Sequence, residues 1–191
     1  MTEGFVILDF GSQFTQLIAR RFRELGFFSE LVPFDISPAE IKNRNPKGII
    51  LSGGPASVFD TDAPRRQVKE LLEIAPVLGI CYGMHLLAQE LGGEVESAST
   101  REYGFATVHW KKPWGNWDVD QKVWMSHGDV VKKAPPGTEM VAWSENEHPA
   151  AMQGKNFWGL QFHPEVSHTE SGTEMLRAFA VDLCKAKKNW S

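Results

Sequence analysis

Short apolar runs punctuate the first half of the chain. The runs at 5–8, 48–51 and 77–80 are apolar throughout, which is typical of strands buried on both faces of a sheet, and 27–32 is a further strand candidate. Strands of this kind need helices to cover them, so the segments between the runs decide the fold class.

Those intervening segments carry helical signals. Apolar residues recur at helical spacing from about 14 to 25, with Gly26 as a stop signal, and another helix is predicted over roughly 63–74. The segment 37–40 combines a capping box with proline at the first helical position. Strands that alternate with helices indicate a mostly parallel sheet, which places its chemistry at the carboxyl ends of the strands.

The pattern changes after residue 93. Four strand-like segments follow, separated by turn residues: 94–110, 122–126, 139–144 and 157–162. They predict antiparallel additions to the same sheet or a small flanking sheet. Ser171 and Glu174 then form a second capping box before a final helix. The sequence therefore predicts an α/β fold with a mostly parallel central sheet, helices on both faces and antiparallel additions in the second half, as one domain over 1–191.

Composition narrows the class of protein. With 191 residues, 42% hydrophobic and 23% charged, the chain has the make-up of a globular domain. A net charge of −4 argues against nucleic acid or an anionic membrane as partner, and no apolar run approaches a membrane span. Cys81 and Cys184 are the two cysteines, which fits a reducing cytoplasm and offers no zinc-type spacing, so we expect no metal site.

The segment 77–87 is the most informative part of the sequence. An apolar strand runs into Gly79-Ile80-Cys81-Tyr82-Gly83, and a helical pattern follows, as in a nucleophile elbow with cysteine in place of serine. The positive end of the helix favours a thiolate, and the amide after the cysteine faces a developing oxyanion. A buried structural cysteine at a strand end is the alternative.

A thiol nucleophile needs a base, and the base needs an orienting group. His163 and Glu165 stand two residues apart at the end of another strand-like run, with proline between them. Glu165 is then placed to hold the imidazole in the tautomer that accepts the thiol proton. A hydrogen-bonded histidine without a catalytic role is the competing interpretation.

A glycine pair follows the run at 48–51, in the sequence Ser52-Gly53-Gly54-Pro55. Backbone amides in such a turn can approach a ligand closely, and the Walker pattern of a phosphate loop is absent. An oxyanion donor at Gly54 is the better interpretation, and a simple tight turn is compatible with it.

At these residues the chain resembles the class I glutamine amidotransferases and, within them, the glutaminase domains of GMP synthases. The general motifs are Ser-Gly-Gly-Pro at 52–55, Gly-Ile-Cys-Tyr-Gly-Met at 79–84 and His-Pro-Glu at 163–165. The narrower ones are Leu-Asp-Phe-Gly-Ser-Gln at 8–13, Arg-Glu-Tyr-Gly at 101–104, Trp-Met-Ser-His-Gly-Asp at 124–129 and Val-Ser-His-Thr at 166–169.

The resemblance implies a role for each matching position. Cys81 is then the nucleophile, His163 the base and later the acid, and Glu165 the orienting carboxylate. The oxyanion amides belong to Gly54 and Tyr82. The amino-acid end of glutamine is held by backbone at Ser126, His127, Gly128 and Asp129.

One position departs from the family, which has glutamine where this chain has His85. On a helix, four residues past Cys81, the imidazole is expected on the side of the nucleophile, where it contacts the substrate and binds glutamine more weakly. Packing without substrate contact is the alternative.

The resemblance also implies a partner. Ammonia from glutamine passes to an ATP-dependent synthetase of the ATP-pyrophosphatase type, which aminates xanthosine monophosphate to GMP. We expect no cofactor in this domain, with ATP and magnesium confined to that partner, either a continuation past Ser191 or a separate subunit. Open alternatives are an amidotransferase subunit serving another synthetase, a weakly active or regulatory docking domain, and a cysteine peptidase.

Overall fold

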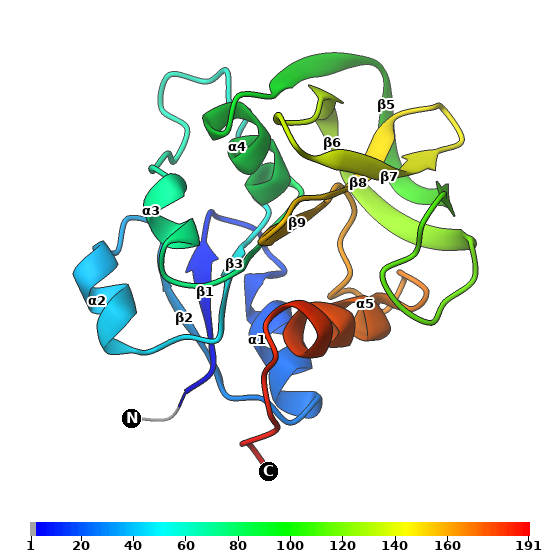
Figure 1. Ribbon diagram of the computed structural model, residues 1–191. Helices are drawn as coiled ribbons and strands as arrows, with labels where there is room; N and C mark the ends of the chain where they lie inside the picture. The colour runs from blue at the N-terminus through cyan, green and yellow to red at the C-terminus, as the bar shows by residue number, and fades with distance from the viewer. Residues whose placement is uncertain (1–2) are drawn as a thin grey trace.

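The computed structural model describes residues 3–191, which contain one nine-stranded sheet in the order β2-β1-β3-β4-β9-β8-β7-β5-β6 (Figure 1). The first five strands in this order run parallel to one another. They are β2 (Ser29–Pro33), β1 (Phe5–Asp9), β3 (Gly48–Leu51), β4 (Val77–Ile80) and β9 (Phe157–Leu160). β9 comes from the C-terminal part of the chain but pairs with β4, so it places residues near 160 beside residues near 80.

The second half of the chain extends the same sheet with antiparallel strands. These are β8 (Pro149–Gln153), β7 (Glu139–Ser144), β5 (Glu94–Trp110) and β6 (Asp120–Lys133). Of the two arrangements expected from the sequence, addition to the same sheet is therefore the correct one. The segment 122–126 is only part of the longer β6, and β8 was not anticipated, because its proline and small residues give a weak strand signal.

Helices cover both faces of the parallel strands, because alternate residues of each buried strand point to opposite sides. Phe5 and Ile7 of β1 pack with α1 (Thr15–Glu24), α5 (Gly172–Ala178) and the π-helical turn η1 (Phe179–Leu183). Val6 and Leu8 face α2 (Pro38–Asn43), α3 (Lys69–Leu72) and α4 (Tyr82–Glu90). No helix within residues 3–191 combines the length and apolar character that crossing a bilayer requires.

Two sequence expectations about helix ends differ in outcome. Ser37 caps α2 as expected, since its hydroxyl accepts a hydrogen bond from the Glu40 amide at 3.2 Å. The capping box at Ser171 is wrong. Its backbone is left-handed with φ 55°, and it makes no side-chain capping bond. A capping side chain needs an extended backbone, so the hydroxyl of a left-handed residue points elsewhere.

The helix expected over 63–74 is also wrong in extent, since only Lys69–Leu72 is α-helical. The preceding segment bonds to other parts of the fold instead. The Tyr82 hydroxyl donates to Pro64 O at 2.6 Å, and the Arg66 guanidinium donates to Ile36 O at 2.7 Å. These tertiary bonds compete with a helix that Pro64 already disfavours.

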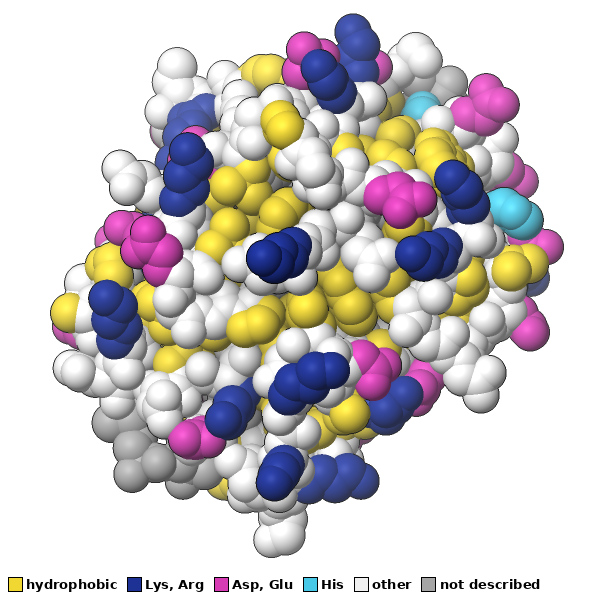
Figure 2. All heavy atoms as spheres, viewed as in Figure 1, with side chains coloured by type: hydrophobic (Ala, Val, Ile, Leu, Met, Phe, Trp, Pro, Cys, Tyr) yellow, Lys and Arg dark blue, Asp and Glu magenta, His cyan; other side chains and the backbone are white. Residues whose placement is uncertain are grey.

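The face seen in Figure 2 carries lysine and arginine side chains scattered among acidic and apolar ones, without a continuous basic field.

Candidate active site

The strand β4 passes directly into α4, and Cys81 is the single residue between them. Its backbone has φ 53° and ψ −111°, a combination that residues with a side chain rarely adopt. The turn is so tight that a Cβ at Gly79 would lie 2.6 Å from the carbonyl oxygen of Gly83. Glycine at 79 and at 83 therefore avoids a clash at this elbow.

His163 and Glu165 follow β9, and β9 pairs with β4, so the two strand ends bring Cys81 and His163 to the same edge of the sheet. The Cys81 amide donates to Leu160 O at 2.7 Å, and the His163 amide donates to Trp124 O at 3.0 Å. His163 Nδ1 donates to Glu165 Oε1 at 2.6 Å, and the two side chains are 2% and 0% exposed. The residues that the sequence analysis put in one triad therefore lie together.

The environment of His163 favours its protonated form. Burial lowers the pKa of the imidazole, but the charge of Glu165 and hydrogen bonds with Cys81 and Glu165 raise it more, so the pKa stands well above its usual 6.5. The Phe14 ring lies edge-on to the imidazole, with 5.4 Å between the ring centroids. An apolar wall and a single carboxylate thus hold a cationic imidazole beside the thiol.

The loop after β3 lies against this pair. A Cβ added to Gly53 would stand 2.8 Å from His163 Cε1 and 3.2 Å from Cys81 Cβ, so a side chain has no room there. Within residues 3–191, the backbone amides of Gly54 and Tyr82 have no hydrogen-bond acceptor. Both amides are therefore available to a ligand, as an oxyanion hole requires.

A cavity of about 340 Å³ opens beside His163. Its walls are the turn at 11–14, Gly54, Pro55 and Ser126. Cys81 is only 1% exposed and does not line this cavity. In this conformation Cys81 is therefore almost closed to solvent.

The sequence pattern of the family described as "Glutamine amidotransferase class-I" matches residues 6–183. The chain belongs to the class I glutamine amidotransferases. The matched region contains the elbow, the glycine loop after β3 and the turn that carries His163 and Glu165. The family expected from the short motifs is therefore confirmed across nearly the whole chain.

Relatives with curated names are similar in sequence to this amidotransferase. A GMP synthase (glutamine-hydrolyzing) from Bdellovibrio bacteriovorus is 57% identical over 187 residues, covering 98% of this chain and 37% of the relative. Its counterpart from Brachyspira hyodysenteriae is 48% identical over 192 residues, covering 97% of this chain and 37% of the relative. The amidotransferase chain thus spans about 37% of the length of these relatives.

A solved structure shares the fold of this amidotransferase. The crystal structure of a protein from Thermoplasma acidophilum, described as one subunit of a GMP synthase, matches with a TM-score of 0.81 at 28% identity. The match covers 97% of this chain and 94% of that one. The expected fold class, an α/β fold with a sheet that is parallel in part, is confirmed.

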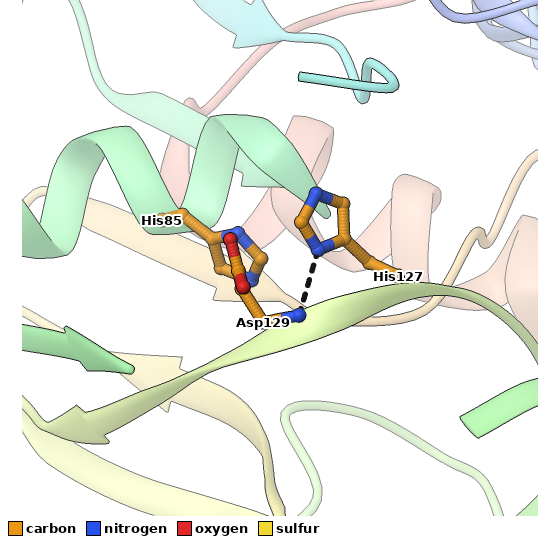
Figure 3. A group of neighbouring side chains, drawn as sticks. All are labelled: His85, His127 and Asp129. Atoms are coloured by element: carbon orange, nitrogen blue, oxygen red, sulfur yellow. Dashed lines mark hydrogen bonds between the residues drawn. The ribbon is translucent and has the colours of Figure 1, made fainter. Parts of the chain in front are cut away.

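The resemblance stated from the sequence implies five glutamine-binding residues in this amidotransferase. Three of the five lie together in the structure. His85 on α4 and His127 on β6 have ring centroids 4.7 Å apart, and Asp129 lies beside them (Figure 3). Ser126 lies at the cavity instead, and Gly128 lies against Arg101, since a Cβ at Gly128 would be 3.2 Å from Arg101 Nε. Contact of each with substrate stays a prediction.

His85 itself is fully buried. Its Nε2 atom lies 2.7 Å from Gln161 Oε1. Burial, together with the neighbouring charge of His127, lowers the pKa of His85 to about 4. The imidazole is therefore neutral near pH 7 and brings no positive charge to the neighbouring thiol.

Several contacts of the site have no signal in the sequence. Ser126 Oγ lies 2.7 Å from His163 Nε2, although the family comparison had assigned only the backbone of Ser126 a role. The Thr169 hydroxyl donates to His163 O at 2.6 Å and accepts from the Trp124 amide at 3.0 Å, which ties the histidine turn to β6. Arg21 on α1 donates to Glu165 O at 2.9 Å. Thr169 belongs to the Val-Ser-His-Thr motif, which assigned it no role, and Arg21 belongs to none of the motifs.

The spacing of the two cysteines predicts no metal site. The structure nevertheless brings His85, His127 and Asp129 close enough to hold a metal ion, with one ligand atom from each within 4.8 Å of the others. Cysteine spacing could not reveal this group, because its members are histidine and aspartate from distant segments.

Proposed function

We propose that this chain hydrolyses the side-chain amide of glutamine through a thioester at Cys81. The observation that carries the proposal is the geometry of His163, whose Nδ1 atom donates to Glu165 while the rest of the ring faces the buried elbow. Membership of the class I glutamine amidotransferases supports the choice of substrate.

In the proposed mechanism, the Cys81 thiolate attacks the carboxamide carbon of glutamine. The oxygen becomes an anion that the amides of Gly54 and Tyr82 stabilise. The carbon–nitrogen bond then breaks as protonated His163 gives its proton to the leaving ammonia. Water, deprotonated by His163, cleaves the thioester and releases glutamate, while Glu165 keeps the imidazole oriented through both steps.

The ammonia, in this proposal, is consumed by a synthetase. The curated relatives are named GMP synthase (glutamine-hydrolyzing) and are longer than this chain, which supports a second domain or subunit. That partner binds ATP and magnesium and aminates xanthosine monophosphate, and the complete enzyme works in the cytoplasm. This domain then needs no cofactor of its own.

Glutamate and ammonia release from glutamine tests the proposal, in the presence of a GMP synthetase partner with ATP and xanthosine monophosphate. We expect one ammonia per glutamate, no cleavage of peptide substrates, and loss of at least about a thousandfold in Cys81→Ala. Cys184→Ala is the matched control, because Cys184 is buried away from the site and burial raises its pKa. Full release by Cys81→Ala contradicts the mechanism.

Two features of the site favour a second role, that of a weakly active domain which its partner activates. Cys81 is 1% exposed, and His163 Nε2 is already engaged by the Ser126 hydroxyl. The ratio of the glutaminase rates without and with the synthetase then measures how far the isolated domain is inactive. A synthetase serving another pathway is the remaining alternative for the partner.

A further inference from the structure

His85, His127 and Asp129 lie on two elements that meet beside the proposed catalytic residues. His85 comes from α4, while His127 and Asp129 stand two residues apart on β6 (Figure 3). One ligand atom from each lies within 4.8 Å of the other two. Two imidazoles and one carboxylate form a donor set that zinc and its neighbours in the first transition row bind readily.

Among the residues that the structure describes, His85 has one ring nitrogen without a hydrogen-bond partner. Its Nε2 atom donates to Gln161 Oε1 at 2.7 Å, because a carboxamide oxygen can only accept. The proton is therefore on Nε2, and Nδ1 carries a lone pair. Within residues 3–191, Nδ1 has no hydrogen-bond partner, although the side chain is 0% exposed. A buried acceptor without a partner is costly unless a ligand satisfies it.

His127 and Asp129 also make hydrogen bonds to residues outside the cluster. His127 Nε2 donates to Ala56 O at 3.0 Å, which leaves Nδ1 as an acceptor, now used by the Asp129 amide at 2.9 Å. The Asp129 carboxylate accepts from Ser57 Oγ at 2.5 Å. Each ligand candidate thus has an outer partner that fixes its orientation, an arrangement typical of metal ligands.

We propose that His85, His127 and Asp129 bind a divalent transition-metal ion of the zinc type. In a tetrahedral zinc site the ligand atoms stand about 3.4 Å apart. The atoms here lie within 4.8 Å of one another, so on binding the largest separation shortens by up to about 1.4 Å. Three protein ligands leave a coordination position for water. Because these residues are also expected at the glutamine pocket, an inference that rests on the proposed function, the bound ion excludes glutamine and inhibits the domain.

Calorimetric titration of the metal-free protein with Zn²⁺, and absorption titration with Co²⁺, test the site directly. Both use the Cys81→Ala background, so that the thiol cannot serve as ligand. We expect one ion per chain, and a loss of affinity of about a hundredfold or more in His85→Gln and in Asp129→Asn, each checked for native circular dichroism. His109→Gln is the matched control, because His109 pairs with Asp120 on the exposed surface.

Unchanged affinity in both His85→Gln and Asp129→Asn overturns the proposal, as does loss of binding in His109→Gln or the absence of a one-to-one complex. A separate assay follows glutamine hydrolysis by the protein with Cys81 intact, in the presence of the GMP synthetase partner with ATP and xanthosine monophosphate. Zn²⁺ is expected to inhibit competitively with glutamine, and His85→Gln is expected to resist it. Binding without any hydrolysis would contradict the proposed function alone, whereas hydrolysis without binding would contradict the metal site alone.

Discussion

The Glu165 carboxylate meets His163 through one of its two oxygens. Oε1 accepts from Nδ1 at 2.6 Å, whereas Oε2 has no hydrogen-bond partner within residues 3–191. One bond is enough to fix the tautomer, because a proton held on Nδ1 leaves Nε2 for exchange with a neighbouring group. It also places a full negative charge against a buried ring, which is why the pKa of His163 rises despite burial.

Glu165→Gln tests this charge through the pH dependence of stability. The folded-state pKa of His163 is raised, so its stabilising contribution is complete below the unfolded value of about 6.5 and is lost as pH rises toward about 10. We expect the unfolding free energy of the wild type to exceed that of the variant most below pH 6.5, with the gap narrowing as pH rises. Urea unfolding between pH 6 and 10 measures it. A gap that widens with pH contradicts the assignment.

Ser126 occupies the nitrogen that the mechanism needs. Its hydroxyl lies 2.7 Å from His163 Nε2, the atom proposed to exchange a proton with Cys81. We expect Ser126→Ala to raise the glutaminase rate of the isolated domain by about two- to tenfold, the equivalent of one hydrogen bond of ordinary strength. Steady-state ammonia release measures this, with the exposed Ser171→Ala as control. A lower rate would mean that the hydroxyl positions the imidazole.

At the scale of elements, the junction of β4 and α4 stores strain at one residue. Cys81 holds φ 53° between a strand and a helix that both lie in the core, so the surrounding structure enforces the conformation. The motif was recognisable in the sequence because its geometry depends on five consecutive residues and on the two glycines that flank the cysteine.

A pair of substitutions at Cys81 measures this strain. In most positions glycine is less stable than alanine by about 0.5–1 kcal/mol. Here we expect Cys81→Gly to be more stable than Cys81→Ala by about 1 kcal/mol, because glycine adopts positive φ without penalty. Ala88→Gly in α4 is the control and should destabilise by about 1 kcal/mol or more. Equal stability of the two Cys81 variants in urea unfolding would argue that the elbow is unstrained.

Contacts that depend on strand register could not be predicted from the sequence. The hairpin of β5 and β6 has one register shift between Glu94 and Val95 and another between Ser97 and Glu102, and these help to set which residues of β6 face His163. The Ser126 hydroxyl and the cluster of His85 with Asp129 follow from that register. Short-range signals such as Ser37 survive in the structure, whereas the signal at Ser171 is overridden by the turn that precedes its helix.

At the scale of the whole molecule, β9 joins two halves of different character. On one side it pairs with the parallel strands, and on the other it pairs with the antiparallel β8 (Figure 1). The parallel half could be predicted because its strands are continuous apolar runs. The order of the second half could not, because strands with mixed polarity can add to either edge of a sheet.

The shared strand predicts that both halves unfold together. Five of the seven tryptophans stand between residues 110 and 143, while Trp158 lies on β9 and Trp190 contacts Phe28, so fluorescence reports mainly on the second half. α1 to α4 dominate the helical signal in circular dichroism. We expect the two probes to give the same midpoint in urea, as for a cooperative two-state transition. A fluorescence change at lower urea would show that the antiparallel half unfolds first.

The concealment of Cys81 beneath its loops has a kinetic consequence. With 1% of the residue accessible, an alkylating reagent reacts only during transient opening, so the labelling rate equals the open fraction multiplied by the reactivity of an accessible thiol. The labelling rates of alkylating reagents of increasing size would therefore report how wide the opening is. Any effector that widens the opening would increase the labelling rate of the larger reagents most.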